Sequence, residues 1–274
     1  MSELVSRAGE KAKAIFKVQV SLAVNNESLP PKSFPPPFCA YYNCYKDEVT
    51  VYTRRMQQVA EMHDLDLDKM VAYIICHEYG HAKQARIFES SQICPWYLRM
   101  RPQCIVELSG VGIPLERADV NFVIDGLLDF CVDKELHKHG ISIPWAKSRL
   151  RDLKLKPGNA DEAFLYVRTK ELPVDISFYE FGELSDSEKE AMKVAITEWV
   201  GGRWDKVYRL VGTLEFWDPN RYCNVLETLI TVLFGQCVAF LLTSSALIFR
   251  GRNRPSFWDN NQYFVPHVMP KSVQ

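Results

Sequence analysis

Two histidines and a glutamate stand in the spacing HExxH within residues 72–84, AYIICHEYGHAKQ. Positions four apart in an α-helix lie on the same face, so the imidazoles of His77 and His81 can reach one ion together. Imidazole nitrogen is a common ligand of Zn2+ and binds it at about 2.0–2.1 Å. The pair therefore predicts a metal site that holds one zinc ion per chain.

Glu78 follows the first histidine, where its carboxylate can act on a water molecule without binding the metal. Zinc lowers the pKa of a bound water to about 7, and a carboxylate beside it can take the proton and later give it to the leaving group. The three residues together predict a zinc-dependent hydrolase in which Glu78 is the general acid and base. The alternative without chemistry is an amphipathic helix that carries two ordinary histidines.

A zinc site of this kind needs a third protein ligand, and a second helical segment offers several. Within residues 113–139, polar side chains recur every four positions, whereas the opposite face of the helix is apolar. The recurring side chains are Asn121, Asp125, Asp129 and Asp133. An amphipathic helix that exposes its acids to water would show the same pattern, so the stripe alone does not select a ligand.

HEYGH followed by NFVIDGLLDF at residues 121–130 resembles the HExxH plus NxxxDxxx(N/D) pattern of the minimal metallopeptidase domains that accompany von Willebrand A-like domains, a small zincin family. The resemblance spans residues 40–135. It implies two helices that face each other, with Asp125 as the third zinc ligand and with Asn121 and Asp129 orienting the ligands or water. It also implies a peptidase whose substrate is a polypeptide.

The residues themselves leave other third ligands open, namely Glu116, Asp129 and His137. His137 stands with His139 at the end of the second helix, where cationic side chains complement the helix dipole.

Other functions of the protein stay open as well. HExxH specifies the metal and the base but not the leaving group, so a zinc hydrolase of a non-peptide amide would carry the same motif. A protein with a zincin fold can also serve as a non-catalytic scaffold or interaction protein.

The HEYGH segment lies in the middle of a predicted helix that spans residues 64–88. Acidic residues stand in its first turn, Lys and Arg stand toward its end, and Asp66 is a suitable N-cap. Before it, KVQVSLAV at residues 17–24 alternates with period two, and CAYYNCY and EVTVYTRR are rich in β-branched and aromatic residues. These segments predict a small sheet within residues 17–54.

The composition of the chain changes near residue 155, where a basic stretch gives way to an acidic one. Beyond it, Ser185 and Glu188 have the spacing of a capping box that opens a helix. We expect a zincin-like metallopeptidase domain at residues 1–155 and a helical C-terminal region at residues 156–274. The expected fold class is α+β and predominantly helical, with a small sheet, the HExxH helix and a second ligand helix followed by further helices.

Residues 229–249, LITVLFGQCVAFLLTSSALIF, carry no charge and are long enough to span a bilayer. RGRNR follows, so the positive-inside rule would send the preceding chain across the membrane, although the N-terminus does not resemble a signal peptide. A helix that is apolar on all sides is either a membrane span or the core of a helical domain, and both interpretations stay open. We expect a cytoplasmic protein, associated with a membrane if this helix is a span.

The 274-residue chain has 33 Lys and Arg against 34 Asp and Glu, which gives a formal net charge of −1 at pH 7. No excess of positive charge is available to neutralise a phosphate backbone, so nucleic acid is not an expected partner. The eight cysteines form no CxxC pair, and most are expected to be reduced and buried.

Overall fold

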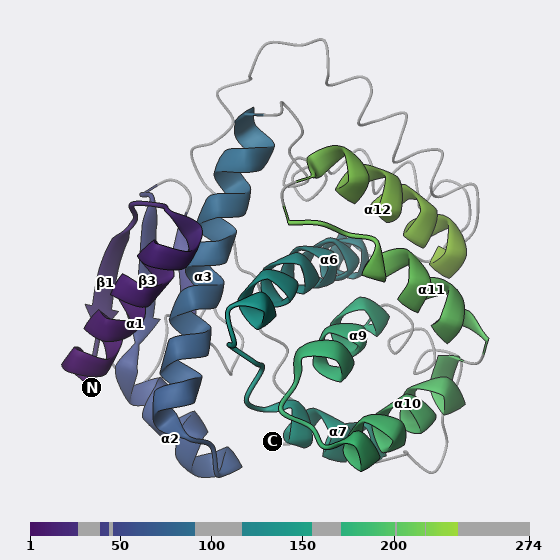
Figure 1. Cartoon of the computed structure of the whole chain (residues 1–274), viewed down its shortest axis with the longest axis horizontal. Helices are drawn as coiled ribbons and strands as arrows, with labels where there is room; N and C mark the ends of the chain where they lie inside the picture. The colour runs from purple at the N-terminus through teal and green to yellow at the C-terminus, as the bar shows by residue number, and fades with distance from the viewer. Residues whose placement is uncertain are drawn as a thin grey trace.

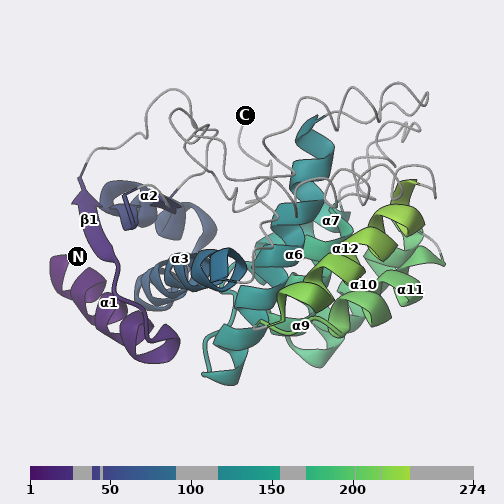
Figure 2. The same cartoon turned by 90° about the horizontal axis from the view of Figure 1, so that it is seen from above.

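A computed structural model of the chain describes residues 1–26, 39–43, 46–90, 117–154, 171–200, 202–216 and 218–234. They form a predominantly helical molecule with one small sheet, which confirms the predicted α+β class (Figure 1). The long helix α3 (Leu67–Ser90) stands between the sheet on one side and most of the other helices on the opposite side (Figure 2). The HEYGH segment therefore lies in the middle of the molecule.

The N-terminal part builds a three-stranded sheet, and its elements are α1 (Ser2–Phe16), β1 (Ser21–Asn25), β2 (Ala40–Asn43) and β3 (Glu48–Tyr52). The strand order is β1-β3-β2, with β1 parallel and β2 antiparallel to β3. The predicted sheet is confirmed, but its first strand starts later than the alternation indicates. Lys17 caps α1 in the left-handed conformation, with φ 50°, so the chain turns before strand pairing begins at Ser21.

Helix α3 follows α2 (Thr53–His63) and begins at its predicted N-cap. Asp66 Oδ1 accepts hydrogen bonds from the backbone N–H groups of Asp68 at 2.9 Å and Lys69 at 3.1 Å. These bonds satisfy donors that have no partner within the first helical turn. Because α3 packs against α1, β2 and α6, residues 77–82 at its centre are all buried.

The remaining helices of the described residues are α6 (Arg117–Lys138), α7 (Ala146–Lys154), α9 (Leu172–Phe181), α10 (Asp186–Val200), α11 (Arg203–Gly212) and α12 (Pro219–Phe234). Helix α9 lies in the middle of this group and packs against α6, α7, α10 and α11 (Figure 1). The predicted capping box is present at α10, because Ser185 N–H donates to Glu188 Oε2 at 2.8 Å and Glu188 N–H donates to Ser185 Oγ at 3.3 Å.

Apolar side chains from both parts of the chain meet in one continuous core. Helix α9 packs against α6, and a β-bridge joins Ile143 to Gly182. The boundary predicted near residue 155 falls in residues 155–170, which lie outside the described residues, and it stays a prediction. The figures show α7 and α9, which flank this stretch, on the same side of α3 (Figure 2).

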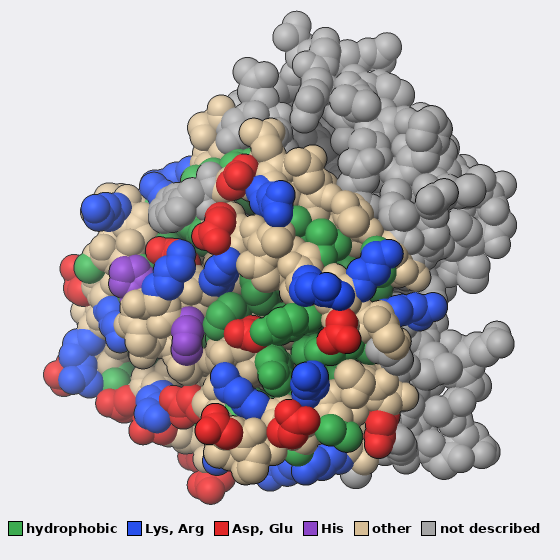
Figure 3. Space-filling view, turned by 45° about the vertical axis from the view of Figure 1, so that its right-hand side comes forward, with side chains coloured by type: hydrophobic (Ala, Val, Ile, Leu, Met, Phe, Trp, Pro, Cys, Tyr) green, Lys and Arg blue, Asp and Glu red, His purple; other side chains and the backbone are tan. Residues whose placement is uncertain are grey.

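Of the apolar run at residues 229–249, the structure describes the first six positions, which end α12, whereas residues 235–249 lie outside the described part. Among the ranges that are described, none of the helices has the length and apolar character needed to cross a membrane. That residues 229–249 are a membrane span, and that they are the core of a helical domain, both stay predictions. On the face shown in Figure 3, Lys and Arg side chains are interspersed with Asp and Glu, in keeping with the balanced composition.

Candidate metal centre

Helices α3 and α6 approach each other closely at the HEYGH segment. A methyl group on Gly80 would lie 2.5 Å from Val132 Cγ1 and 3.1 Å from Phe16 Cζ. Carbon atoms in proteins do not pack as closely as the first of these distances, so glycine is what lets α6 lie this near to α3. The close approach brings the acidic face of α6 to the histidines of α3.

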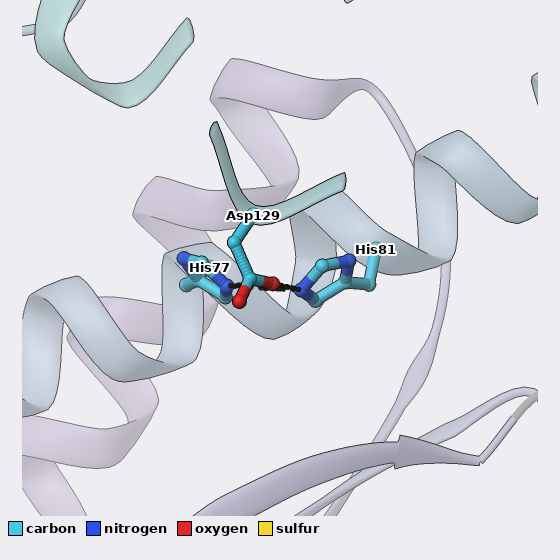
Figure 4. Close-up of side chains that lie close together, drawn as sticks. All are labelled: His77, His81 and Asp129. Carbon is cyan, nitrogen blue, oxygen red and sulfur yellow. Dashed lines mark hydrogen bonds and ion pairs between the residues drawn. The ribbon is translucent and has the colours of Figure 1, made fainter. Parts of the chain in front are cut away.

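Two imidazoles and one carboxylate converge where the helices meet (Figure 4). His77 Nε2 lies 2.9 Å from His81 Nε2, and Asp129 Oδ1 lies 3.4 Å from the first nitrogen and 3.1 Å from the second. Within the described ranges, this is the one group of three His, Cys, Asp or Glu side chains that lie close enough together to share a metal ion. All three side chains are buried. The structure thus shows a cluster that could hold a metal ion.

The spacing of these three atoms fits a tetrahedral ion. Ligands that bind zinc at about 2.0–2.1 Å with tetrahedral angles lie about 3.3 Å from one another. Asp129 Oδ1 is within ion-pair distance of both imidazoles, but it makes no hydrogen bond of good geometry with any residue that the structure describes. A buried carboxylate oxygen of this kind costs free energy unless a cation lies beside it, so the residues fit the expected metal.

The carboxylates around His77 create a negative potential in the site. Burial lowers the pKa of His77, but the charge of Asp133 and the close side-chain contacts with Asp129 and Asp133 outweigh burial and raise this pKa to about 10. Burial raises the pKa of Asp129, whereas its contacts with His77 and His81 lower that pKa to well below its usual range. The potential that holds a proton on His77 would equally hold a divalent cation, which must displace that proton to bind.

Asp133 holds His77 from the side of the ring that faces away from the cluster. Asp133 Oδ1 lies 3.0 Å from His77 Nδ1 and accepts a hydrogen bond from the Tyr73 hydroxyl at 2.6 Å. Because an ionised carboxylate only accepts hydrogen bonds, Nδ1 carries the hydrogen and Nε2 faces the cluster. This is the arrangement in which a carboxylate orients a metal-binding histidine.

Gln84 supports the second histidine in a similar way. Its Oε1 lies 3.0 Å from His81 Nδ1, and its Nε2 donates to the backbone carbonyl of Leu128 at 2.9 Å. With the side-chain oxygen at Nδ1, His81 also presents Nε2 to the cluster. Gln84 thereby joins α3 to α6 at the residue that precedes Asp129.

The third member of the cluster is Asp129 and not Asp125, which the resemblance implies as the ligand. The resemblance implies that Asp129 orients the ligands or water, and the residues themselves leave it open as a ligand. Positions 125, 129 and 133 share one face of α6, and the crossing with α3 places the middle of the three opposite both histidines. Asp125 is buried one turn earlier on the same helix.

The other predicted site residues occupy different surroundings. Glu78 is fully buried, and its charge reaches Tyr73, whose pKa is raised well above its usual value mainly by burial and Asp133. His137 is exposed at the end of α6, where its ring packs on Phe181 with centroids 5.5 Å apart. The side chain of Asn121 and the whole of Glu116 lie outside the described residues.

Sequence reasoning did not find the roles of Tyr73, Gln84 and Ser177. Tyr73 precedes His77 by four positions and Gln84 follows His81 by three, so helical spacing places each beside its histidine and could have revealed both. Ser177 donates to Asp133 Oδ2 at 2.5 Å from a helix far along the chain. No local pattern could have indicated that contact.

No protein-family model matches the sequence, and comparisons with curated proteins and with solved structures also gave no match.

Proposed function

We propose that the protein is a zinc-dependent hydrolase that cleaves peptide bonds. The observation that carries the proposal is the convergence of His77, His81 and Asp129 at the crossing of α3 and α6. Two imidazoles and one carboxylate hold zinc in known peptidases and leave one coordination position open. The resemblance of HEYGH and NFVIDGLLDF to the minimal zincin domains supports the same reaction and a polypeptide substrate.

The carboxylate of Glu78, next to the two histidines, favours zinc over other metal ions at this site. Two histidines and a carboxylate also bind iron in oxygenases, so the ligands alone do not choose the metal. An HExxH helix, however, places a carboxylate directly next to its metal-binding histidines, which is the arrangement of hydrolytic zinc sites. Glu78 supports zinc and hydrolysis for this reason.

Each side chain has a separate task in the proposed reaction. When bound, zinc supplies a water of lowered pKa and polarises the scissile carbonyl. Glu78 takes a proton from the attacking water and gives it to the nitrogen that leaves when the peptide bond breaks. Asp133 and Gln84 accept hydrogen bonds from the Nδ1 atoms of the two histidines, which keeps each Nε2 directed at the ion.

A structural metal centre is the second candidate, and the burial of the site favours it. His77 and His81 are each 1% exposed, and Glu78 is 0% exposed. Structural zinc sites are closed, whereas catalytic ones keep a position for water or substrate. An ion in a closed site would join α3 to α6 without turnover, and the protein would be a non-catalytic scaffold.

Glu78→Gln separates the two candidates, because it removes the proposed base and leaves every ligand in place. We expect one zinc per chain by elemental analysis in both wild type and variant. We expect wild type to cleave a fluorophore-labelled unfolded protein or a mixed peptide library, and hydrolysis by the variant to fall by at least about 100-fold. Asp68→Asn is the matched control, because the side chain of Asp68 lies on the same helix and is 67% exposed. This variant should change neither the zinc content nor the rate of hydrolysis.

Three results would contradict the peptidase. Undiminished hydrolysis by Glu78→Gln would remove the assigned base. Bound zinc without hydrolysis of any polypeptide would select the scaffold. Cleavage of small amides but not of peptides would select a hydrolase with another leaving group.

A further inference from the structure

The carboxylate of Asp133 is held by hydrogen-bond donors on both of its oxygens. Oδ1 accepts from the Tyr73 hydroxyl at 2.6 Å and lies 3.0 Å from His77 Nδ1, while Oδ2 accepts from the Ser177 hydroxyl at 2.5 Å. Asp133 itself is buried. Rotation of the carboxylate would break at least one of these bonds inside the protein, where an unsatisfied polar group costs free energy. The orientation of Asp133 is therefore fixed from two sides.

Tyr73 and Ser177 bring this restraint from different parts of the fold. Tyr73 lies on α3 one turn before His77, and its ring packs edge-on against Trp145 with centroids 4.8 Å apart. Ser177 lies on α9, the helix at the centre of the C-terminal group (Figure 1). The ligands of the proposed metal centre come from α3 and α6 alone. The contact from Ser177 adds a third helix, α9, to the groups that surround it.

Helix α9 is itself held in place by a buried ion group. Arg149 on α7 donates from Nε to Asp175 Oδ1 at 2.6 Å and from Nη2 to Glu171 Oε2 at 2.8 Å. Asp175 therefore faces α7, whereas Ser177, two residues later, faces α6. Because strong polar contacts act on α9 from both neighbours, its position relative to Asp133 is closely determined.

We propose that Tyr73 and Ser177 are positioning residues of the metal centre, which hold Asp133 so that it fixes the ring of His77, and that Ser177 couples the docking of α9 to metal binding. This inference rests on the proposed function in one respect, namely that the cluster holds a metal ion. A carboxylate kept at Nδ1 fixes the ring and makes Nε2 a better ligand, so loosening Asp133 weakens the metal bond. By linkage, a bound ion stabilises the docked position of α9 to the same extent.

Two conservative substitutions with matched controls test the proposal. Ser177→Ala and Tyr73→Phe each remove one hydroxyl that contacts Asp133, and the Tyr73 hydroxyl also lies 3.1 Å from His77 Nδ1. Ser148→Ala and Tyr79→Phe remove a buried hydroxyl of the same kind elsewhere, from contacts with His63 and with the carbonyl of Val20. The measurements are the Kd for Zn2+ by chelator competition and the visible spectrum of the Co2+-substituted protein, which reports the ligand field at the ion. The unfolding midpoint of the metal-free protein serves as the measure of purely structural effects.

We expect Ser177→Ala and Tyr73→Phe to weaken zinc binding by about 10-fold or more and to shift the Co2+ spectrum, because the loss of groups that orient a ligand typically costs about 10- to 100-fold in affinity. The two controls should stay within about twofold of wild type even where their metal-free midpoint falls. Protection of α9 from hydrogen exchange should rise when zinc binds to wild type and rise less in Ser177→Ala.

The outcomes that overturn the proposal differ from those that overturn the proposed reaction. If wild type binds zinc and Ser177→Ala binds it equally well, the positioning role is wrong, whatever the hydrolytic activity. If Ser177→Ala and Ser148→Ala weaken binding to the same extent, the effect is structural and the proposal is also wrong. If wild type binds zinc and hydrolyses nothing, the reaction fails, but a selective loss of affinity in the two variants still supports the positioning role. A wild type that binds no metal overturns both.

Discussion

Asp129 and Asp133 occupy successive turns on one face of α6, yet the crossing with α3 gives them different tasks. Asp129 faces the Nε2 atoms of both histidines, while Asp133 faces Nδ1 of His77. One side chain can thus serve as a ligand and the next can orient a ligand, although both are buried aspartates four positions apart. At the scale of single residues, the task of each acid depends on which imidazole nitrogen it meets.

This assignment predicts opposite results for two isosteric substitutions on α6. Asp129→Asn removes the negative charge and replaces one carboxylate oxygen with an NH2 group. Zinc binding should therefore weaken more than it does when an orienting group is lost, which costs about 10- to 100-fold. Asp125→Asn lies one turn away and should retain one zinc per chain by elemental analysis. Since both changes keep the volume of a buried side chain, each serves as the control for the other. Retention of zinc by Asp129→Asn with loss by Asp125→Asn would restore Asp125 as the ligand.

His77, Glu78 and His81 could be proposed as a site from the sequence because their spacing acts within one helix. The third ligand could not be chosen, because it depends on the register between two helices that are far apart in the chain. That register is set by contacts such as the one between Gly80 and Val132, which no periodicity in either helix reveals. The contact from Ser177 is more distant still, and only the packing of α9 against α6 creates it.

At the scale of secondary-structure elements, the glycine of HEYGH matters because α6 packs directly on it. Gly80→Ala would place Cβ 2.5 Å from Val132 Cγ1, so the helices must separate or Val132 must move. Overpacking of this kind costs about 1–3 kcal/mol, which exceeds the gain of about 1 kcal/mol that alanine brings to a helix interior. We expect a lower free energy of unfolding by denaturant titration and weaker zinc binding, since Asp129 moves away with α6.

The control for this prediction is Gly212→Ala on α11, where a Cβ would meet nothing within 4 Å. It should leave zinc binding unchanged. Combining Gly80→Ala with Val132→Ala removes the Val132 atoms that clash with the new Cβ. The double variant should therefore bind zinc more tightly than Gly80→Ala alone, and the effects of the two substitutions on zinc binding should not be additive. Additive effects, or full zinc affinity in Gly80→Ala, would show that the close approach does not set the position of Asp129.

The elements themselves were more accessible to sequence reasoning than their arrangement. The N-cap at Asp66 and the capping box at Ser185 rest on local hydrogen bonds, and both are present. Gly140 follows the last turn of α6 with a φ of 71°, a conformation that glycine adopts without strain. The first strand begins later than the alternation predicts, because alternation does not reveal the left-handed turn at Lys17.

At the scale of the whole molecule, the described helices on either side of residues 155–170 are joined by polar as well as apolar contacts. Arg149 is 3% exposed, and its ion pairs with Glu171 and Asp175 connect α7 to α9 across that stretch. Burial lowers the pKa of Arg149, but the two carboxylates outweigh it and raise this pKa, so the charges stay paired inside the protein. Separating the two parts would expose this group together with the shared core, which favours their unfolding as one unit.

Zinc should therefore stabilise the whole chain in a single step. A ligand that binds only the folded state at 100 times its Kd adds about 2.7 kcal/mol to the free energy of unfolding, which for a chain of this size corresponds to a rise in Tm of about 5–10 °C. Differential scanning calorimetry of the metal-free and zinc-loaded protein should show one transition that moves upward by this amount, and no such shift in Asp129→Asn. Because Ser177 and Arg149 link α9 to the centre, helices beyond residue 170 should gain stability along with α3 and α6. Two separate transitions, of which zinc moves only one, would mean that the regions before and after residue 155 unfold independently and that the ion acts on the first alone.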